Sequence, residues 1–164
     1  MQTLDLGGSW TVRRSGERAS TKAVVPGNVH HDMLKAKRIP DPFVSDNELQ
    51  VKWVGESDWA YARTFTIPAQ LLKHDTVMLR CEGLDTLATV IVNGKTVGQT
   101  DNMFRIWEFD VKPVAKVGKN TIEIRFASAV QYVRKCIAAR PKNQPLPQWR
   151  QPGSEPGAMF IRKE

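Results

Sequence analysis

Hydrophobic and polar residues alternate with a period of two in several short segments, which is the pattern of a half-buried β-strand. The clearest case is residues 121–126, where Ile122, Ile124 and Phe126 alternate with polar or charged neighbours. Turn-forming residues bound most of these segments. The strands predicted in this way are residues 10–13, 22–25, 61–67, 76–81, 88–92, a return strand from residue 97, and residues 121–126.

The dipeptide Asn93-Gly94 follows the apolar run of residues 88–92 directly. Asn-Gly is typical of a type I′ turn, because both central residues of that turn need positive φ. We therefore expect a two-residue β-hairpin whose return strand begins near Val97.

Seven or eight short strands at fairly regular spacing, without alternating long helices, predict an all-β fold built as an antiparallel sandwich or barrel. Short helices interrupt the strands. Asn28 is placed to cap a helix over residues 29–36, and Asp46 or Asn47 to cap one over residues 48–52. Residues 127–139 also have helical composition.

The composition changes near residue 140. Half of the ten prolines lie between Pro141 and Pro156, so this stretch predicts neither a helix nor a central strand. We divide the chain into a β-sandwich domain over residues 1–135 and a proline-rich basic tail over residues 136–164. The last six residues are strand-like again, and we expect the tail to be the truncated end of the same domain.

The net charge of +7 is concentrated toward the C-terminal end of the chain. Seven basic and two acidic residues lie from Arg134 onward, so residues 134–164 carry +5 and residues 1–133 only +2. The nearly balanced body argues against a nucleic-acid-binding domain.

Few residues are arranged for chemistry. His30-His31-Asp32 is interpreted as the polar surface of a short helix, with no metal site, because adjacent histidines point in different directions. Cys81 falls on the inward face of a strand and is expected in the core, and nothing marks Cys136 as a nucleophile. Several carboxylates cluster between residues 41 and 58, but a cluster in sequence is not a catalytic pair in space. We predict no catalytic residue, no metal and no cofactor.

No apolar run approaches the ~20 residues that span a bilayer, so no membrane partner is expected. The first residues also lack the basic and apolar regions of a secretory signal. From this we expect a cytoplasmic protein.

The aromatic residues have two interpretations. A further strand is predicted over residues 104–111, in which Trp107 shares one face with Phe109 and Val111, as core residues would. Phe104 and Ile106 point to its opposite face, so either both faces are covered or that end packs on another domain. Trp53 and Trp59 lie in a long polar segment. They either stack against a sugar or pin an ordered loop onto the sandwich.

A series of motifs, taken in order, resembles the amino-terminal domain of a glycoside hydrolase family 2 β-mannosidase over residues 4–135. Those motifs are the segments at residues 25–30, 39–43, 46–48 with Trp53, 58–65, 83–86, 92–94, 102–104 and 109–111.

The resemblance implies a jelly-roll β-sandwich, galactose-binding-domain-like, called the sugar-binding domain. It implies that an immunoglobulin-like domain and a TIM barrel are partners, that the barrel carries both catalytic glutamates of a retaining mechanism, and that the substrate is a terminal β-mannoside. By motif position, Asp46, Asn47, Glu48 and Trp53 are assigned to the lining of the substrate cleft. Phe104, Ile106 and Phe160 are assigned to an interface with the other domains. The sequence departs from the family in its proline-rich tail and in lacking the W-D-W segment that usually grips the terminal mannose.

Two other functions remain open. A free-standing carbohydrate-binding module shares the jelly-roll shape and would bind mannan or cellulose by itself. A nucleic-acid binder acting through the basic tail would bind less tightly as salt increases. The leading prediction is a non-catalytic structural and sugar-binding domain of a β-mannosidase.

Overall fold

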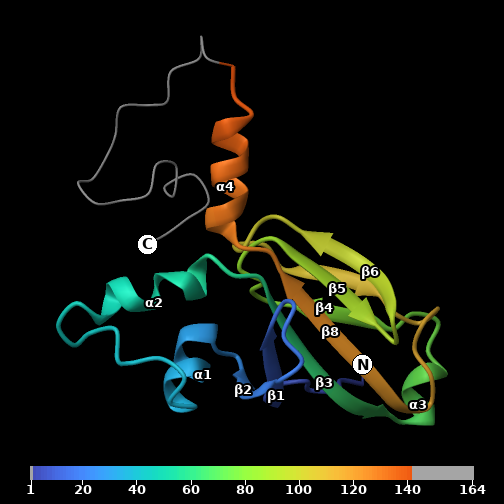
Figure 1. Cartoon of the computed structure of the whole chain (residues 1–164). Coiled ribbons are helices and arrows are strands. Elements are labelled where there is room, and N and C mark those ends of the chain that lie inside the picture. Colours follow the sequence, from blue (N-terminus) through green and yellow to red (C-terminus); the bar gives the residue numbers. More distant parts are fainter. Residues whose placement is uncertain (1, 142–164) are drawn as a thin grey trace.

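The computed structural model describes residues 2–141, which form two antiparallel β-sheets and four short helices (Figure 1). The strands are β1 (Gly8–Arg14), β2 (Thr21–Val25), β3 (Trp59–Ile67), β4 (Met78–Cys81), β5 (Ala88–Val92), β6 (Lys95–Thr100), β7 (Trp107–Asp110) and β8 (Gly118–Phe126). The helices are α1 (Val29–Lys35), α2 (Asn47–Gly55), α3 (Ala69–Leu72) and α4 (Ala129–Ala138).

The larger sheet has six strands in the order β2-β1-β3-β8-β5-β6, and the smaller sheet pairs β4 with β7. The centre of the six-stranded sheet is the pair β3 and β8. These two nine-residue strands stay in register from Trp59 opposite Phe126 to Ile67 opposite Gly118. Side chains of both sheets belong to one hydrophobic cluster. The predicted antiparallel β-sandwich is therefore confirmed.

The predicted hairpin joins β5 to β6. Asn93 and Gly94 have φ of 50° and 79°, as a turn with two left-handed residues requires. The Asn93 side chain does more than permit the turn. Its Nδ2 donates to Val114 O (2.8 Å) and to Asn120 Oδ1 (2.7 Å), while its Oδ1 accepts from Thr121 N (2.9 Å). The turn is thereby fastened to β8 and to the segment that leads into it.

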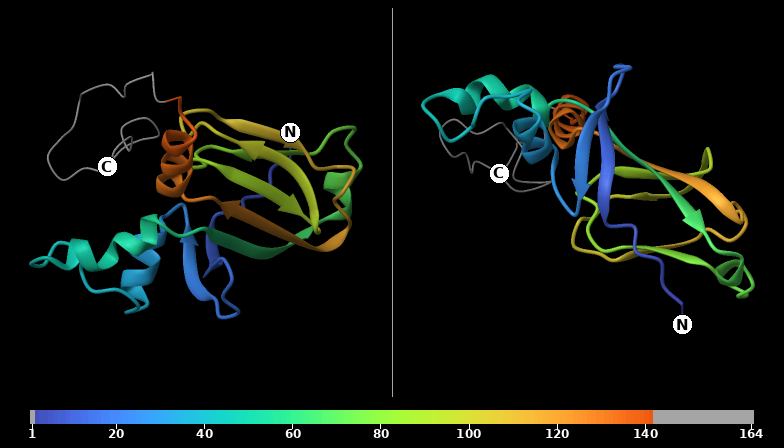
Figure 2. Two further views of the ribbon diagram at one scale, coloured as in Figure 1. Left: turned by 45° about the horizontal axis from the view of Figure 1, so that its top comes forward. Right: turned by 90° about the horizontal axis from the view of Figure 1, so that it is seen from below.

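Three of the helices begin near residues that the sequence indicated. Asn28 caps α1, its side chain accepting from His31 N at 2.9 Å, and Ser128 caps α4 in the same way. Asp46 precedes α2 without a capping hydrogen bond. Helices α1 and α2 lie together beyond the β2 edge of the large sheet, and α3 lies at the opposite end (Figures 1 and 2).

Two expectations are corrected. Asp32 was expected at the surface but is only 2% exposed, because its carboxylate accepts hydrogen bonds from Val24 N (3.1 Å) and Tyr61 OH (2.8 Å). The strand expected from residue 104 begins only at Trp107. Its start is displaced by a turn in which Asn102 Oδ1 accepts from Phe104 N and Asn102 O accepts from the indole of Trp107.

The predicted domain boundary between residues 135 and 136 falls inside α4. The tail beyond residue 141, with the predicted interface residue Phe160, lies outside the described residues. Within residues 2–141, no helix is both long and apolar enough to cross a membrane.

Candidate functional site

The four predicted cleft residues lie on or beside α2. Asp46 precedes the helix, Asn47 and Glu48 begin it, and Trp53 lies in its last turn. At 1.5 Å per residue, Asp46 and Trp53 are separated by about 10 Å along the helix axis. The structure therefore brings Asp46, Asn47 and Glu48 together and places Trp53 in a different environment.

The polar groups at the start of α2 shape the preceding loop. Asn47 Nδ2 donates to Asp41 O at 2.9 Å, and Asp41 Oδ1 accepts from Phe43 N at 3.0 Å. This loop leaves the Phe43 side chain 96% exposed and Val44 also exposed. Glu48 is exposed on the first turn. The loop thus presents an apolar tip beside a carboxylate.

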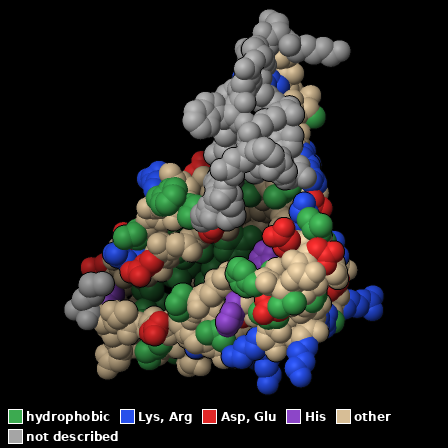
Figure 3. Space-filling model, turned by 90° about the vertical axis from the view of Figure 1, so that its left-hand side faces the viewer, with side chains coloured by type: hydrophobic (Ala, Val, Ile, Leu, Met, Phe, Trp, Pro, Cys, Tyr) green, Lys and Arg blue, Asp and Glu red, His purple; other side chains and the backbone are tan. Residues whose placement is uncertain are grey.

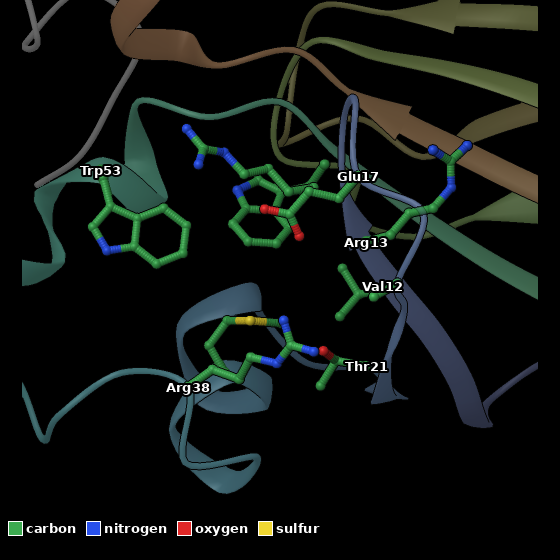
Figure 4. Close-up of a pocket in the computed structure, with 10 residues that line it drawn as sticks. Val12, Arg13, Glu17, Thr21, Arg38 and Trp53 are labelled. Atoms are coloured by element: carbon green, nitrogen blue, oxygen red, sulfur yellow. The ribbon is translucent and has the colours of Figure 1, made fainter.

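Trp53 borders a pocket of about 170 Å³ between the β1–β2 hairpin, α1 and α2 (Figure 4). Its floor is apolar, because Val12, Met33 and Trp59 are all buried. The residues that line this Trp53 pocket are Val12, Arg13, Arg14, Glu17, Ala19, Thr21, Met33, Arg38, Trp53 and Trp59.

The two tryptophans have different roles. Trp59 is buried on β3, and its Nε1 donates to Val54 O at 2.8 Å, so it fixes the end of α2 against the sheet. Trp53 is half-buried, with its ring centroid 5.9 Å from that of Trp59. The Arg14 guanidinium lies 5.1 Å from the Trp53 ring centroid, within the range of a cation–π contact.

Charged side chains surround the pocket. Glu17 and Arg38 point into it, whereas Arg13 points away (Figure 4) and pairs with Glu123 at 3.4 Å. Among residues 2–141, no ion pair within 4.0 Å joins Glu17 to Arg14 or Arg38. The pocket therefore holds two guanidinium groups and one carboxylate that do not neutralise one another directly.

Sequence reasoning missed Arg14, Glu17 and Arg38. Charged residues in a hairpin tip or after a short helix look like ordinary solvated surface. They reach the pocket because β1 and β2 pair with Val12 opposite Thr21, which places the hairpin tip beside α2. The sequence contains no signal for this pairing beyond the two predicted strands.

A second, larger groove of about 570 Å³ lies between the ends of β5, β6 and β8 and the start of α4. Its lining mixes aromatic and polar side chains, among them Trp107, Tyr132, Asp58, Asp101 and Gln99. Trp107 is stacked nearly parallel to Phe109, with ring centroids 6.4 Å apart, and Arg105 lies 4.8 Å from its centroid. None of these residues was predicted as part of a site.

The predicted interface residues Phe104 and Ile106 are exposed, Phe104 by 85%. Figure 3 shows the end of the molecule that carries α1 and α2, where a hollow with hydrophobic side chains on its floor opens to the surface. Exposed apolar groups thus occur both in the loop before α2 and in the turn before β7. Whether another domain covers them stays a prediction.

Comparison with known proteins identifies relatives of this chain. It is 36% identical to a β-mannosidase of Rattus norvegicus over 99% of its length, and 38% identical to β-mannosidase B of Thermothelomyces thermophilus over 81%. It superposes on the crystal structure of a β-D-mannosidase from Dictyoglomus thermophilum with a TM-score of 0.85 and 38% identity, covering 91% of this chain. A β-D-glucuronidase for Dictyoglomus thermophilum superposes with a TM-score of 0.59 at 22% identity, a likeness of fold alone.

The chain spans only 18% of the length of the Rattus relative and 16% of the Thermothelomyces relative. The family model described as the glycosyl hydrolase 2 galactose-binding domain-like domain matches residues 10–164. This match confirms the resemblance that the sequence motifs indicated. The chain belongs to the galactose-binding domain-like family of glycosyl hydrolase 2.

Proposed function

We propose that this chain is a non-catalytic domain of a glycoside hydrolase that removes terminal β-D-mannose residues with retention of configuration. The observation that carries the proposal is the 36% identity to a β-mannosidase over 99% of the chain. Similarity to the glucuronidase is far weaker, with 22% identity. The preference for a β-mannosidase over sibling enzymes rests on this contrast.

In this proposal the chemistry takes place in other domains of the enzyme. The relatives are more than five times longer than the segment that this chain matches. An immunoglobulin-like domain and a TIM barrel are the partners that the resemblance implies, with the catalytic carboxylates in the barrel. The present domain would support the barrel and form one wall of a short pocket for the terminal mannose.

The loop before α2 is the segment best placed to form that wall. It carries an exposed phenylalanine, Phe43, next to the polar group Asp46, Asn47 and Glu48. Apolar side chains exposed to this degree are typical of surfaces that pack against a partner. Trp53 would contribute to the same wall from the other end of the helix.

The test is a set of aryl glycosides assayed with the complete enzyme. We expect kcat/KM for the β-D-mannoside to exceed that for the β-D-glucuronide and the β-D-galactoside by at least a factor of about 100, a lower bound, since a site built to hydrogen-bond a hydroxyl group rejects an analogue without it by ~10⁴–10⁵. A preference for either of the other two glycosides would refute the proposed specificity.

The cleft assignment needs variants in the same enzyme. Asn47→Ala and Glu48→Gln should lower kcat/KM for the mannoside about tenfold each if these side chains contact substrate or hold the loop that does. Asn102→Ala, at an asparagine of another exposed turn, is the matched control. If Asn47→Ala, Glu48→Gln and Trp53→Ala all leave catalytic efficiency unchanged, the cleft assignment is wrong.

A further inference from the structure

We propose that Glu56 and Arg134 are positioning residues, which set the angle between α2 and α4 and thereby hold the substrate wall in place against the rest of the enzyme. The inference rests on the proposed function, because it takes α2 as part of that wall. It adds two residues that do not belong to the predicted cleft lining. We refer to residues 53–58, Ser128 and Arg134 together as the α2–α4 junction.

The junction provides partners for carbonyl groups at the end of α2. The last carbonyl groups of a helix have no partner within the helix and need one elsewhere. The indole of Trp59 donates to Val54 O at 2.8 Å. Ser128 Oγ donates to Gly55 O at 2.7 Å. The second donor belongs to α4, so the end of α2 is completed by a residue of the other helix.

Ser128 fixes the start of α4 against the end of α2. It is the N-cap of α4, and its Oγ accepts from Gln131 N at 3.1 Å. Its own N–H donates to the Asp58 carboxylate at 2.7 Å, where a negative charge is favoured by the helix macrodipole. Ser128 is only 5% exposed, so these contacts are shielded from water.

The ion pair of Glu56 and Arg134 is a second contact, further along α4. Arg134 Nη2 lies 2.7 Å from Glu56 Oε1. Arg134 follows Ser128 by six residues, which is about 9 Å along the helix axis. A single contact at the start of a helix leaves its direction free, whereas a second contact about 9 Å away fixes that direction.

Helix α4 has few other attachments. It stands at the end of the sandwich that carries α2 (Figures 1 and 2). Among the residues of α4, all of which the structure describes, only Val133 is buried. The polar contacts of the junction therefore carry much of the attachment of this helix.

Glu56 occupies a position that does not favour a carboxylate. It is the C-cap of α2, where the helix macrodipole places a partial negative charge. Both partners of the ion pair are partly exposed, and such pairs contribute little to the stability of a domain. A charged residue that breaks a local rule without a large gain in stability is typical of a functional position. We therefore assign the pair to orientation of the helices.

The two helices lead to different parts of the proposed enzyme. Helix α2 and the residue before it carry the four residues assigned to the cleft. The resemblance makes this the amino-terminal domain, so the remaining domains follow α4 in the sequence. The angle at the junction therefore determines how the wall meets the domain that carries the chemistry.

Double electron–electron resonance on the 164-residue chain tests the angle. Spin labels on Cys136, which is exposed, and on Lys52→Cys report the distance between α4 and α2, while Cys81 is buried. We expect one narrow distance distribution, and Arg134→Gln should broaden it at least about twofold because α4 then samples more orientations. Lys135→Gln is the matched control, since Lys135 is the next residue and makes no ion pair among residues 2–141. An unchanged distribution in Arg134→Gln, or equal broadening in Lys135→Gln, overturns the proposal.

Charge reversal in the complete enzyme tests the effect on the substrate site. Glu56→Arg and Arg134→Glu should each raise KM for an aryl β-D-mannoside at least about fivefold and leave kcat within about twofold, because a wall that binds substrate and transition state equally affects KM alone. The double variant again pairs opposite charges, so its KM should return to within about twofold of the unmodified enzyme. Unchanged KM in the single variants, a change confined to kcat, or a double variant no better than the single ones overturns the proposal.

The two proposals fail separately. If the unmodified enzyme prefers another glycoside, the proposed specificity fails, and the same KM ratios measured with that glycoside decide the role of the junction. If the enzyme prefers the mannoside but the reversed charges leave KM unchanged, the positioning role fails and the proposed function stands.

Discussion

Single buried polar residues hold this sandwich together at points where segments far apart in sequence meet. Asp32 of α1 accepts from Val24 N of β2 and from the Tyr61 hydroxyl of β3. Burial, with the Asp32 hydrogen bond, raises the pKa of Tyr61 well above its usual value. The hydroxyl therefore stays protonated and remains a donor, and α1 is fixed against two strands by one carboxylate.

Because the Cys81 thiol is buried, we expect the free energy of unfolding to fall at alkaline pH. Burial raises the pKa of this thiol from 9.0 to about 11. An unfolded chain releases this proton from about pH 9, whereas the folded chain retains it, so the unfolded state is favoured increasingly as pH rises from 9 to 11. We expect the free energy of unfolding to fall by about 2 kcal/mol from this group over that range.

Chemical denaturation at pH 8, 9, 10 and 11 measures this loss. Cys81→Ala should be less stable at pH 8 because of the lost packing, but should lose less stability than the unmodified chain above pH 9. Cys136→Ala is the control, since Cys136 is exposed. Identical pH profiles for Cys81→Ala and the unmodified chain would contradict this account.

Among single polar substitutions in this domain, we expect replacement of Asn120 to lower the free energy of unfolding most. It is 0% exposed, its Nδ2 donates to Lys116 O (2.6 Å) and Gly118 O (2.8 Å), and its Oδ1 accepts from Asn93 Nδ2. Asn120→Ala leaves these buried groups without partners, so we expect a loss of about 3 kcal/mol in the free energy of unfolding. Urea denaturation tests this, with Asn102→Ala in an exposed turn expected to lose less than about 1 kcal/mol. Similar losses for both variants would show that burial of the Asn120 network is unimportant.

These residues mark the limit of what sequence predicts at this scale. Asn93 was predictable because Asn-Gly has a local conformational signature. The burial of Asp32 was not predictable, because its partners Val24 and Tyr61 lie on strands whose position relative to α1 cannot be read from the sequence. A carboxylate on a short helix looks the same in sequence whether it faces solvent or a buried hydroxyl group.

Among the elements, strands β6 and β7 approach each other more closely than any side chain at residue 98 would allow. A Cβ atom on Gly98 would lie 2.0 Å from the Phe109 ring. The contact links the edge of the six-stranded sheet to the two-stranded sheet. Glycine at this position therefore permits the two sheets to pack.

Gly98→Ala should consequently destabilise the chain. We expect a loss of about 2 kcal/mol, since a methyl group in a filled interior forces the ring or the strand to shift. Gly55→Ala provides the control, because nothing lies within 4 Å of its Cβ position and alanine favours a helix. Thermal denaturation distinguishes the two, and a combined variant with Phe109→Leu should recover part of the loss. If Gly98→Ala is as stable as the unmodified chain, this account of the sheet contact is wrong.

The sequence predicted an element best where a local signal, either strand alternation or a helix cap, marks it. Helix α1 was predicted to within one residue, because the Asn28 cap is a local signal. Strand β8 was predicted to its observed end but begins three residues earlier than its alternation indicated. The start of β7 was missed, since the turn at Asn102 is made by hydrogen bonds that composition does not reveal. The one-turn helix α3 is too short to have a period.

For the whole molecule, the exposed apolar groups predict a difference between the domain alone and the complete enzyme. Phe104 is 85% exposed, so Phe104→Ser should leave the free energy of unfolding of the chain unchanged to within about 0.5 kcal/mol. If Phe104 packs against another domain, the same substitution should destabilise the complete enzyme by about 1–2 kcal/mol and lower its Tm.

Val117→Ser is the matched control for this comparison. Val117 is also exposed and apolar but was not predicted as an interface residue. We expect it to change neither the chain nor the enzyme. Equal Tm values for the Phe104→Ser and unmodified enzymes would remove Phe104 from the interface.

At this scale the resemblance carried by the sequence motifs predicted the family, and the regular spacing of short alternating segments predicted the class of fold. They did not predict the Trp53 pocket. Glu17, Arg38 and Trp53 lie on three different segments, and only the folded arrangement of hairpin, α1 and α2 brings them together. A site assembled from long-range packing leaves no local pattern for a single sequence to reveal.

The central claim is that this domain assists a β-mannosidase without carrying its chemistry. The most direct measurement compares release of the aryl group from an aryl β-D-mannoside by the chain alone and by the complete enzyme, at equal molar concentration. We predict turnover by the enzyme and none by the chain above the uncatalysed rate. Hydrolysis by the chain alone, or failure of the enzyme to hydrolyse the mannoside, would contradict the claim.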